Sequence, residues 1–167
     1  MSKIFFLFIL LFSSQAYGAG ILETEKLVEQ VDSIRKALVT SVVQKPDEEL
    51  FNQVCKPVGM NIKKIYDEKK IKIRQASHKP RNPKNKADKN ELLSIKMFSE
   101  RNDINSVWLK IDGKRHYFKR ITVQKNCLAC HGEKSKRPSF VKGKYLADKA
   151  FDFKVGDIRG VYHVIVE

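Results

Sequence analysis

The five residues Cys127-Leu128-Ala129-Cys130-His131 constrain this chain more than any other part of its sequence. Two thiols separated by two residues can each add to one of the two adjacent vinyl groups of a haem, and the histidine that follows then lies beneath the iron. The motif therefore predicts one covalently attached haem c per chain. Cys127 and Cys130 would form the thioethers, and His131 would be an axial ligand of the iron.

Two other chemistries use a C-x-x-C pair. A structural zinc site needs two more ligands, and the sequence has neither a second C-x-x-C nor a His-x-x-x-His. A redox pair of the thioredoxin type opens a helix after a strand, whereas Lys125-Asn126 precede this motif and Gly132 with a polar loop follows it. We therefore favour haem over zinc or a disulfide.

The N-terminus has the features of a secretory signal peptide. Lys3 is followed by the apolar run Ile4–Phe12 and by small or polar residues up to Gly18, which favours cleavage after Gly18. The apolar run is too short to span a bilayer, so we expect no stable membrane span after cleavage. We expect residues 1–18 to be the signal and 19–167 a single periplasmic domain; an uncleaved, tethered form is the alternative.

The chain is strongly basic, with a formal net charge of +14. Such a charge favours anionic partners. Export removes most opportunities to meet nucleic acid, so we expect no nucleic-acid partner and instead a redox or signalling protein, with the positive charge favouring an acidic one. The lysine-rich stretches Lys63–Lys72 and Lys134–Lys144 are either solvated faces or a docking surface for such a partner.

The first part of the expected domain, residues 19–76, has the apolar periodicity of two helices. Residues 22–43 carry one apolar stripe that includes Leu27, Val31 and Leu38. A second helix is predicted to begin after Pro46, with acidic residues in its first turn. Pro57 should kink or interrupt that helix.

Residues 77–167 contain loops, a short helix and strands. Ser77–Lys89 is polar, which predicts a loop. Asp88 and Glu91 have the spacing of a capping box, which predicts a helix that ends near Glu100. Asp112-Gly113 predicts a type I′ turn between strands Val107–Ile111 and Lys114–Val123. This register pairs residue 109 with 116, 107 with 118, and 108 with 117.

The last part of the chain contains a second polar loop and a final strand. Gly132–Gly143 is polar and basic, and Ile158–Val166 is rich in β-branched residues, as strands are. The order of elements predicts an α+β fold with an antiparallel sheet.

One cysteine remains once the haem motif is assigned. Cys55 lies on the apolar face of the second predicted helix, where a small buried hydrophobe is the ordinary interpretation and a haem ligand is the other. Other side chains able to ligate haem iron are Met60, Met97, His78, His116 and His163. Arg81 either pairs with a haem propionate or is a solvated loop arginine.

Several ordered segments together resemble a known family. These are Asn52–Cys55 with Pro57, Ser77–Asn85, Cys127–Gly132, Tyr145–Ala150 and Gly156–Gly160. They are similar to the soluble c-type haem domains with a PAS-like fold first described structurally in cyanobacteria. The resemblance implies a PAS-like α+β domain in which two N-terminal helices, a loop, a short helix and the sheet cradle the haem, and it implies that Cys55 ligates the iron opposite His131.

The same resemblance and the motif suggest a function without catalysis. We expect a haem-binding module that senses redox state or a small gas, with a single-electron carrier as the alternative. The family's domain also occurs in signalling proteins with kinase segments, so we expect a separate partner to receive the output here. A peroxidase would need an open iron site and distal acid and base residues, and no spacing in the sequence indicates them.

Overall fold

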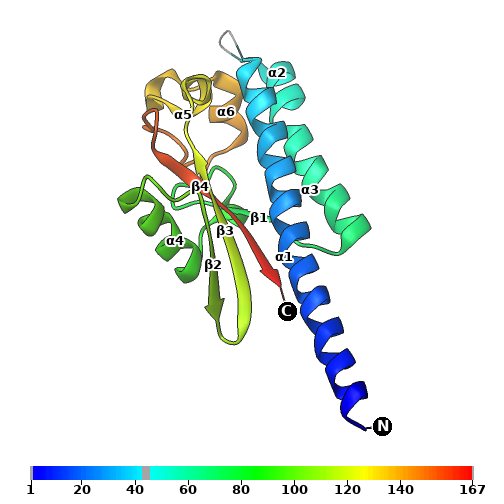
Figure 1. Cartoon of the computed structure of the whole chain (residues 1–167). Coiled ribbons are helices and arrows are strands. Elements are labelled where there is room, and N and C mark those ends of the chain that lie inside the picture. Colours follow the sequence, from blue (N-terminus) through cyan, green and yellow to red (C-terminus); the bar gives the residue numbers. More distant parts are fainter. Residues whose placement is uncertain (1, 43–45, 167) are drawn as a thin grey trace.

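A computed structural model describes residues 2–42 and 46–166 of the chain (Figure 1). Its helices and strands confirm an α+β fold. In chain order they are α1 (Ser2–Thr40), α2 (Glu48–Val54), α3 (Lys56–Lys69), β1 (Arg74–Ala76), α4 (Lys89–Glu100), β2 (Ser106–Ile111), β3 (Lys114–Thr122), α5 (Leu128–His131), α6 (Ser139–Lys144) and β4 (Ile158–Val166).

The four strands form one antiparallel sheet in the order β1-β4-β3-β2. The hairpin between β2 and β3 has the predicted register, with Leu109 opposite His116 and Val107 opposite Phe118. Its turn residues have positive φ angles, 50° at Asp112 and 80° at Gly113, as a type I′ turn requires. The predicted hairpin is therefore confirmed.

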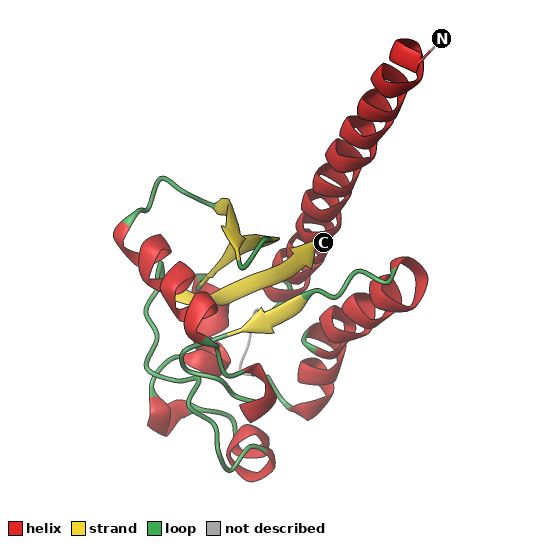
Figure 2. Ribbon diagram, turned by 90° about the horizontal axis from the view of Figure 1, so that it is seen from below, coloured by secondary structure: helices red, strands yellow, loops and turns green. Residues whose placement is uncertain are grey.

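Helices cover both faces of this sheet (Figure 2). On one face, α1 and α3 pack against β3 and β4 through a core that includes Val28, Ile65 and Tyr162. On the other face, α4 packs through Phe98 and Phe118. The haem motif, α6 and the junction of α2 with α3 lie together at the end of the sheet opposite the hairpin turn (Figure 1).

Helix α1 is longer than the predicted helix over residues 22–43, because it begins at Ser2 and continues without a break to Thr40. Val28 and Val31 of the predicted stripe are fully buried. The helix ends at Thr40, and the predicted end at Val43 lies outside the described residues. The N-terminal part of α1 extends beyond the rest of the molecule (Figure 1). In the described part of the chain, no helix combines the length and apolarity needed to cross a bilayer.

The second predicted helix is divided into α2 and α3, as Pro57 predicts. Asp47 caps α2 by accepting a hydrogen bond from the Leu50 amide at 2.8 Å. The division falls at Cys55, which is the C-cap of α2 and the N-cap of α3, and Pro57 lies in the first turn of α3, where a missing N–H costs nothing. Cys55 is therefore at a joint between two helices.

The capping box of α4 is present, with both reciprocal hydrogen bonds between Asp88 and Glu91 at 2.8 Å. Two expectations were wrong. Residues 19–76 include the edge strand β1 besides helices, because its three residues gain a ladder by pairing with distant β4. Residues 132–143 are not a plain loop, since α6 begins at Ser139 after Pro138.

Candidate haem-binding site

A cavity of about 310 Å³ lies at the end of the sheet next to the C-x-x-C-H motif. This volume is within the range of cofactor and ligand pockets. The structure brings all five predicted site residues to its lining, although they come from three separate parts of the chain: Cys55, Arg81, Cys127, Cys130 and His131.

Most of the remaining wall is apolar. It is formed by the C-terminal part of α1, by α2 and α3, and by one residue of β3; its members are Val39, Val42, Leu50, Phe51, Val54, Val58 and Ile121. Side chains of this kind exclude water from a flat apolar macrocycle and lower the dielectric constant around it. The two N-terminal helices thus supply both the apolar wall and Cys55.

The motif itself forms a tight helical turn directly after β3. Cys127 ends a short 3-10 turn, α5 covers Leu128–His131, and the Gly132 amide closes the turn on the Leu128 carbonyl at 2.9 Å. A Cβ atom at Gly132 would lie 2.7 Å from that carbonyl oxygen, so only glycine fits there without displacement. This turn presents both cysteines and the histidine to the same cavity.

His131 is held in one tautomer by the segment that packs against it. Its Nδ1 lies 2.8 Å from the Ala150 carbonyl oxygen, and only a protonated Nδ1 can donate to that acceptor. The Arg81 Nη2 group at 3.4 Å is a second donor and cannot bond to the same atom. Nε2 is therefore the unprotonated nitrogen, which is the form that binds a metal.

Burial and the positive charges of Arg159 and Arg81 lower the pKa of His131 well below its usual value. The imidazole is therefore neutral at physiological pH. A neutral ring with one nitrogen fixed by a carbonyl is the ordinary state of a metal-ligating histidine before it binds.

Cys55 faces the same cavity from the joint between α2 and α3. Its exposed surface belongs to the cavity lining, and the surrounding walls raise the pKa of the thiol to about 11, chiefly through burial. The thiol is therefore protonated at neutral pH in the absence of a metal. Positive charge beside the sulfur is needed to convert it to the thiolate that binds iron.

Arg81 is buried, so the alternative of a solvated loop arginine is wrong. Its Nη2 donates to the Cys130 carbonyl oxygen at 2.6 Å, which ties the loop to the motif. Its Nε lies 3.4 Å from a carboxylate oxygen of Asp148 and has no hydrogen-bond partner among the described residues. A buried donor in that state fits a site that receives an anionic group.

Arg159 is a cavity residue that the sequence did not single out. It lines the cavity from the start of β4 and donates through Nη1 to the Ser77 hydroxyl at 2.6 Å and to the Lys79 carbonyl at 3.2 Å. Burial and the nearby Arg81 lower the pKa of Arg159 to about 10, which still leaves it charged. A second arginine beside Arg81 makes the cavity electropositive, which suits the carboxylates of a haem.

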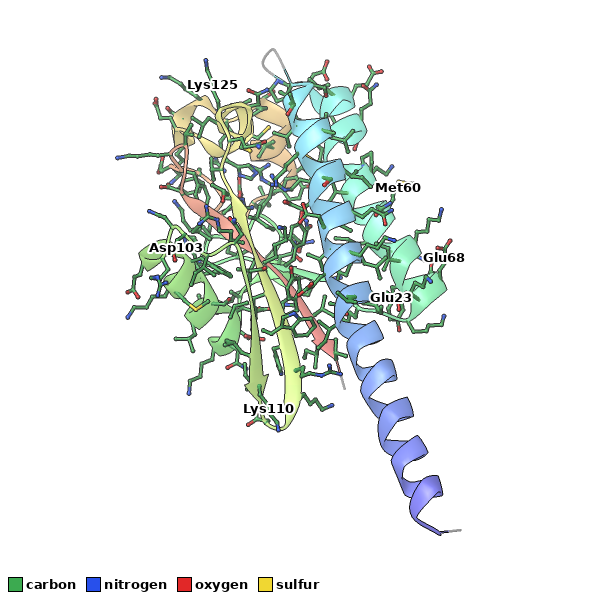
Figure 3. All side chains as sticks on the ribbon, in the orientation of Figure 1. Glu23, Met60, Glu68, Asp103, Lys110 and Lys125 are labelled. Atoms are coloured by element: carbon green, nitrogen blue, oxygen red, sulfur yellow. The ribbon has the colours of Figure 1, made fainter. Side chains whose placement is uncertain are left out.

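The rival iron ligands lie elsewhere in the described structure, and none of them lines the cavity. Met60 is on the outer side of α3 and is 62 % exposed (Figure 3). Met97 packs against the core under α4, and His78 is exposed near Phe153. His116 and His163 bond to each other at 3.0 Å in the interior beneath α4.

The chemistry of the donor set fits haem c. The cavity offers two thiols at the motif spacing, an imidazole, a third sulfur from Cys55 and the three arginines Arg35, Arg81 and Arg159, within a largely apolar wall. The zinc alternative gains no support, because among the described residues the side chains close enough to share a metal ion are Asp88, Glu91 and His163. Cys127 and Cys130 are not joined by a disulfide in this structure.

Comparisons with known proteins agree with this description. The crystal structure of the cyanobacterial heme-protein Tll0287 superposes with a TM-score of 0.80 at 34% sequence identity, over 89% of this chain and 94% of that chain. No curated protein matches the sequence. The chain is thus related to a haem protein, and neither match carries the name of an enzyme. Because the model of the Tll0287-like family matches residues 15–167, the chain belongs to the Tll0287-like family.

Proposed function

We propose that this chain is an exported haem c protein, with Cys127 and Cys130 as thioether ligands and His131 and Cys55 as axial ligands, that senses redox state or a small gas. The observation that carries the proposal is the convergence of the two motif thiols, the free Nε2 of His131 and the thiol of Cys55 on one cavity. The relationship to a haem protein supports it.

Haem iron, when bound, supplies a one-electron centre and a coordination position for a small gas. His131 would stay in place, because Ala150 fixes its ring and α5 fixes its backbone. Arg81 and Arg159 would orient the group through its carboxylates. The N-terminal signal pattern supports a periplasmic location.

The sensor function is favoured over the carrier by the position of Cys55. A ligand at a joint between two helices can move with less disruption than one inside a continuous helix, and its neutral thiol is the form that burial favours. The Cys55 thiol therefore keeps its proton unless a strong positive charge, such as that of ferric iron, lies next to the sulfur. A carrier would instead be expected to keep both ligands in both oxidation states.

Carbon monoxide binding separates these two functions. A sensor in which Cys55 takes up a proton on reduction should bind carbon monoxide as the ferrous protein, with a shifted absorption spectrum, and should not bind it as the ferric protein. An absorption spectrum of the reduced protein that carbon monoxide leaves unchanged would support the carrier. A purified periplasmic protein without haem absorption would refute both.

A further inference from the structure

The segment Ala150–Phe153 connects His131 to the protein surface. The Ala150 carbonyl accepts the hydrogen bond from His131 Nδ1 at 2.8 Å, and the Phe153 amide donates to the His131 carbonyl at 3.1 Å. The Phe153 ring meets the imidazole edge-on, with 6.2 Å between ring centroids. Phe151 follows Ala150 directly and is only half-buried. Few bonds therefore separate the imidazole from the surface at Phe151.

Cations gather over this aromatic pair. The Nζ atoms of Lys134 and Lys79 lie 5.0 and 5.8 Å from the centre of the Phe151 ring, and the guanidinium of Arg137 lies 4.7 Å from it. Lys79 is closer still to the Phe153 ring, at 4.4 Å. Among the described residues, neither lysine ammonium forms an ion pair with a carboxylate. Arg137 pairs with the buried Asp148.

Most lysines of the two lysine-rich stretches are bound to a carboxylate or a backbone carbonyl, and the exceptions among the described residues are Lys72 and Lys134. Lys63 and Lys64 pair with acidic residues one turn along α3. Lys136 pairs with Glu133, and Lys144 with Glu48. A charge that is already paired contributes little to the attraction of a partner. Lys79 and Lys134 retain their full charge next to the segment Ala150–Phe153, which contacts His131.

We infer that the patch formed by Lys79, Lys134, Arg137 and Phe151 is the docking surface for a carboxylate-rich redox protein. This inference rests on the proposed function, because it assumes that the cavity holds a haem. A reduced partner docked here would give up one electron to ferric iron, and Cys55 would then leave the iron and take up a proton from water. Positive charge on the patch steers the acidic partner to the one place where Phe151 and Ala150 lead to the axial histidine.

A lipid surface is the other anionic target for such a patch. Insertion into a bilayer interface calls for exposed aromatic side chains, whereas Phe151 lies half-buried beneath the cations. A compact group of cations around one ring suits a few carboxylates on a protein better than an extended headgroup layer. We therefore commit to the acidic protein.

Electron-transfer rates test the docking surface. Hexacyanoferrate(III), an anionic oxidant that takes one electron from ferrous iron, should react about tenfold more slowly with the double variant Lys79→Gln/Lys134→Glu than with the wild type at low salt. The matched control Lys72→Gln/Lys110→Glu removes the same charge from exposed sites away from the motif, and Lys110 is next to the hairpin turn (Figure 3). The control should change the rate by less than about twofold, because distant charges are screened.

Equal losses of rate in both variants would overturn the docking surface. Absence of haem from the protein would instead overturn the proposed function.

A second readout does not depend on the haem. Carbodiimide cross-linking of the protein to poly-glutamate, mapped by mass spectrometry, should join carboxylates to Lys134 and Lys79 before Lys72 and Lys110. Preferential cross-linking of the control lysines would contradict the inference. So would a Lys134→Glu variant that loses binding to phosphatidylglycerol vesicles but keeps both the wild-type oxidation rate and the preferential cross-linking at Lys79.

Discussion

The cavity at the end of the sheet and the interior beneath α4 both bury histidine, but they leave it in different states. Beneath α4, His163 uses both ring nitrogens: Nδ1 bonds to Glu91 at 2.9 Å and Nε2 to His116 at 3.0 Å. His131, which lines the cavity, has a hydrogen bond at Nδ1, and its Nε2 has no partner among the described residues. Both positions hold histidine, but His163 has partners on both ring nitrogens and lies away from the cavity, whereas His131 lines the cavity.

The carboxylate beneath α4 is satisfied as completely as its histidine. Glu91 is fully buried and accepts from Arg74 Nε at 2.7 Å and from the Asp88 amide at 2.8 Å. Burial alone would raise the pKa of Glu91, but the hydrogen bonds from His163, Asp88 and Arg74 outweigh it and lower that pKa. With the cation of Arg74 already bound, the group of Asp88, Glu91 and His163 is a structural network and not a metal site.

The largest expected effect is the loss of covalent haem from the cavity. Changing Cys127 and Cys130 together to alanine should abolish covalent haem, because both thioether positions are lost, and should leave a poorly folded chain. Haem staining after denaturing electrophoresis measures this, since thioethers survive denaturation. Cys55→Ala is the matched control and should keep the stain. Stain retained in the double variant would contradict the assignment of the motif.

The next effect concerns the redox potential. An anionic thiolate stabilises ferric iron, so Cys55→Ser should raise the midpoint potential by about 0.1 V or more, within the ≈ 0.8 V range that axial ligands span. Spectroelectrochemical titration gives the value. The variant should also bind carbon monoxide more readily, and an unchanged potential would make Cys55 a packing residue.

In the interior beneath α4, Glu91→Gln should lower the free energy of unfolding by about 3 kcal/mol. The substitution removes the buried carboxylate to which Arg74 and His163 bond. Urea unfolding of the holoprotein measures the loss. Glu100→Gln, on the exposed end of the same helix, should cost less than about 0.5 kcal/mol. Similar losses in both variants would show that the network adds no stability.

The smallest effect is a pH dependence. Burial, and then the neighbouring His163, lower the pKa of His116 below its unfolded value of 6.5. The unfolded chain then binds more protons than the folded one just below pH 6.5, so stability should fall as the pH falls through that range. In His116→Gln this loss should be smaller. Parallel curves of unfolding free energy against pH would refute a role for His116.

Local patterns in the sequence were enough for much of the fold. The type I′ turn, the capping box of α4 and the interruption at Pro57 depend on residues close together in the chain, and each is confirmed. Strand β1 was not predicted, because its three residues have no strand pattern of their own and are a strand only through pairing with β4. Gly160 of β4 marks that approach, since a Cβ there would collide with the Ala76 carbonyl oxygen.

The candidate site also has a part that could be predicted and a part that could not. The C-x-x-C-H motif is contiguous and was identified from the sequence, and the family resemblance pointed to Cys55. The approach of Cys55 to His131 depends on tertiary packing and could not be derived from local patterns. Arg159 could not be singled out, since its role depends on bonds to Ser77 and Lys79, which are far away in sequence. A lone histidine gives no sign of which nitrogen remains free, so the sequence left His116 and His163 as alternatives to Cys55 for the second axial position.

Paramagnetic resonance of the ferric protein tests the central claim, that the cavity holds a haem between His131 and Cys55. The wild type should give a low-spin signal from thiolate opposite imidazole, and Cys55→Ser should convert it to a high-spin signal with water in the open position, while His116→Gln leaves it unchanged. A Cys55→Ser signal identical to that of the wild type would contradict the claim.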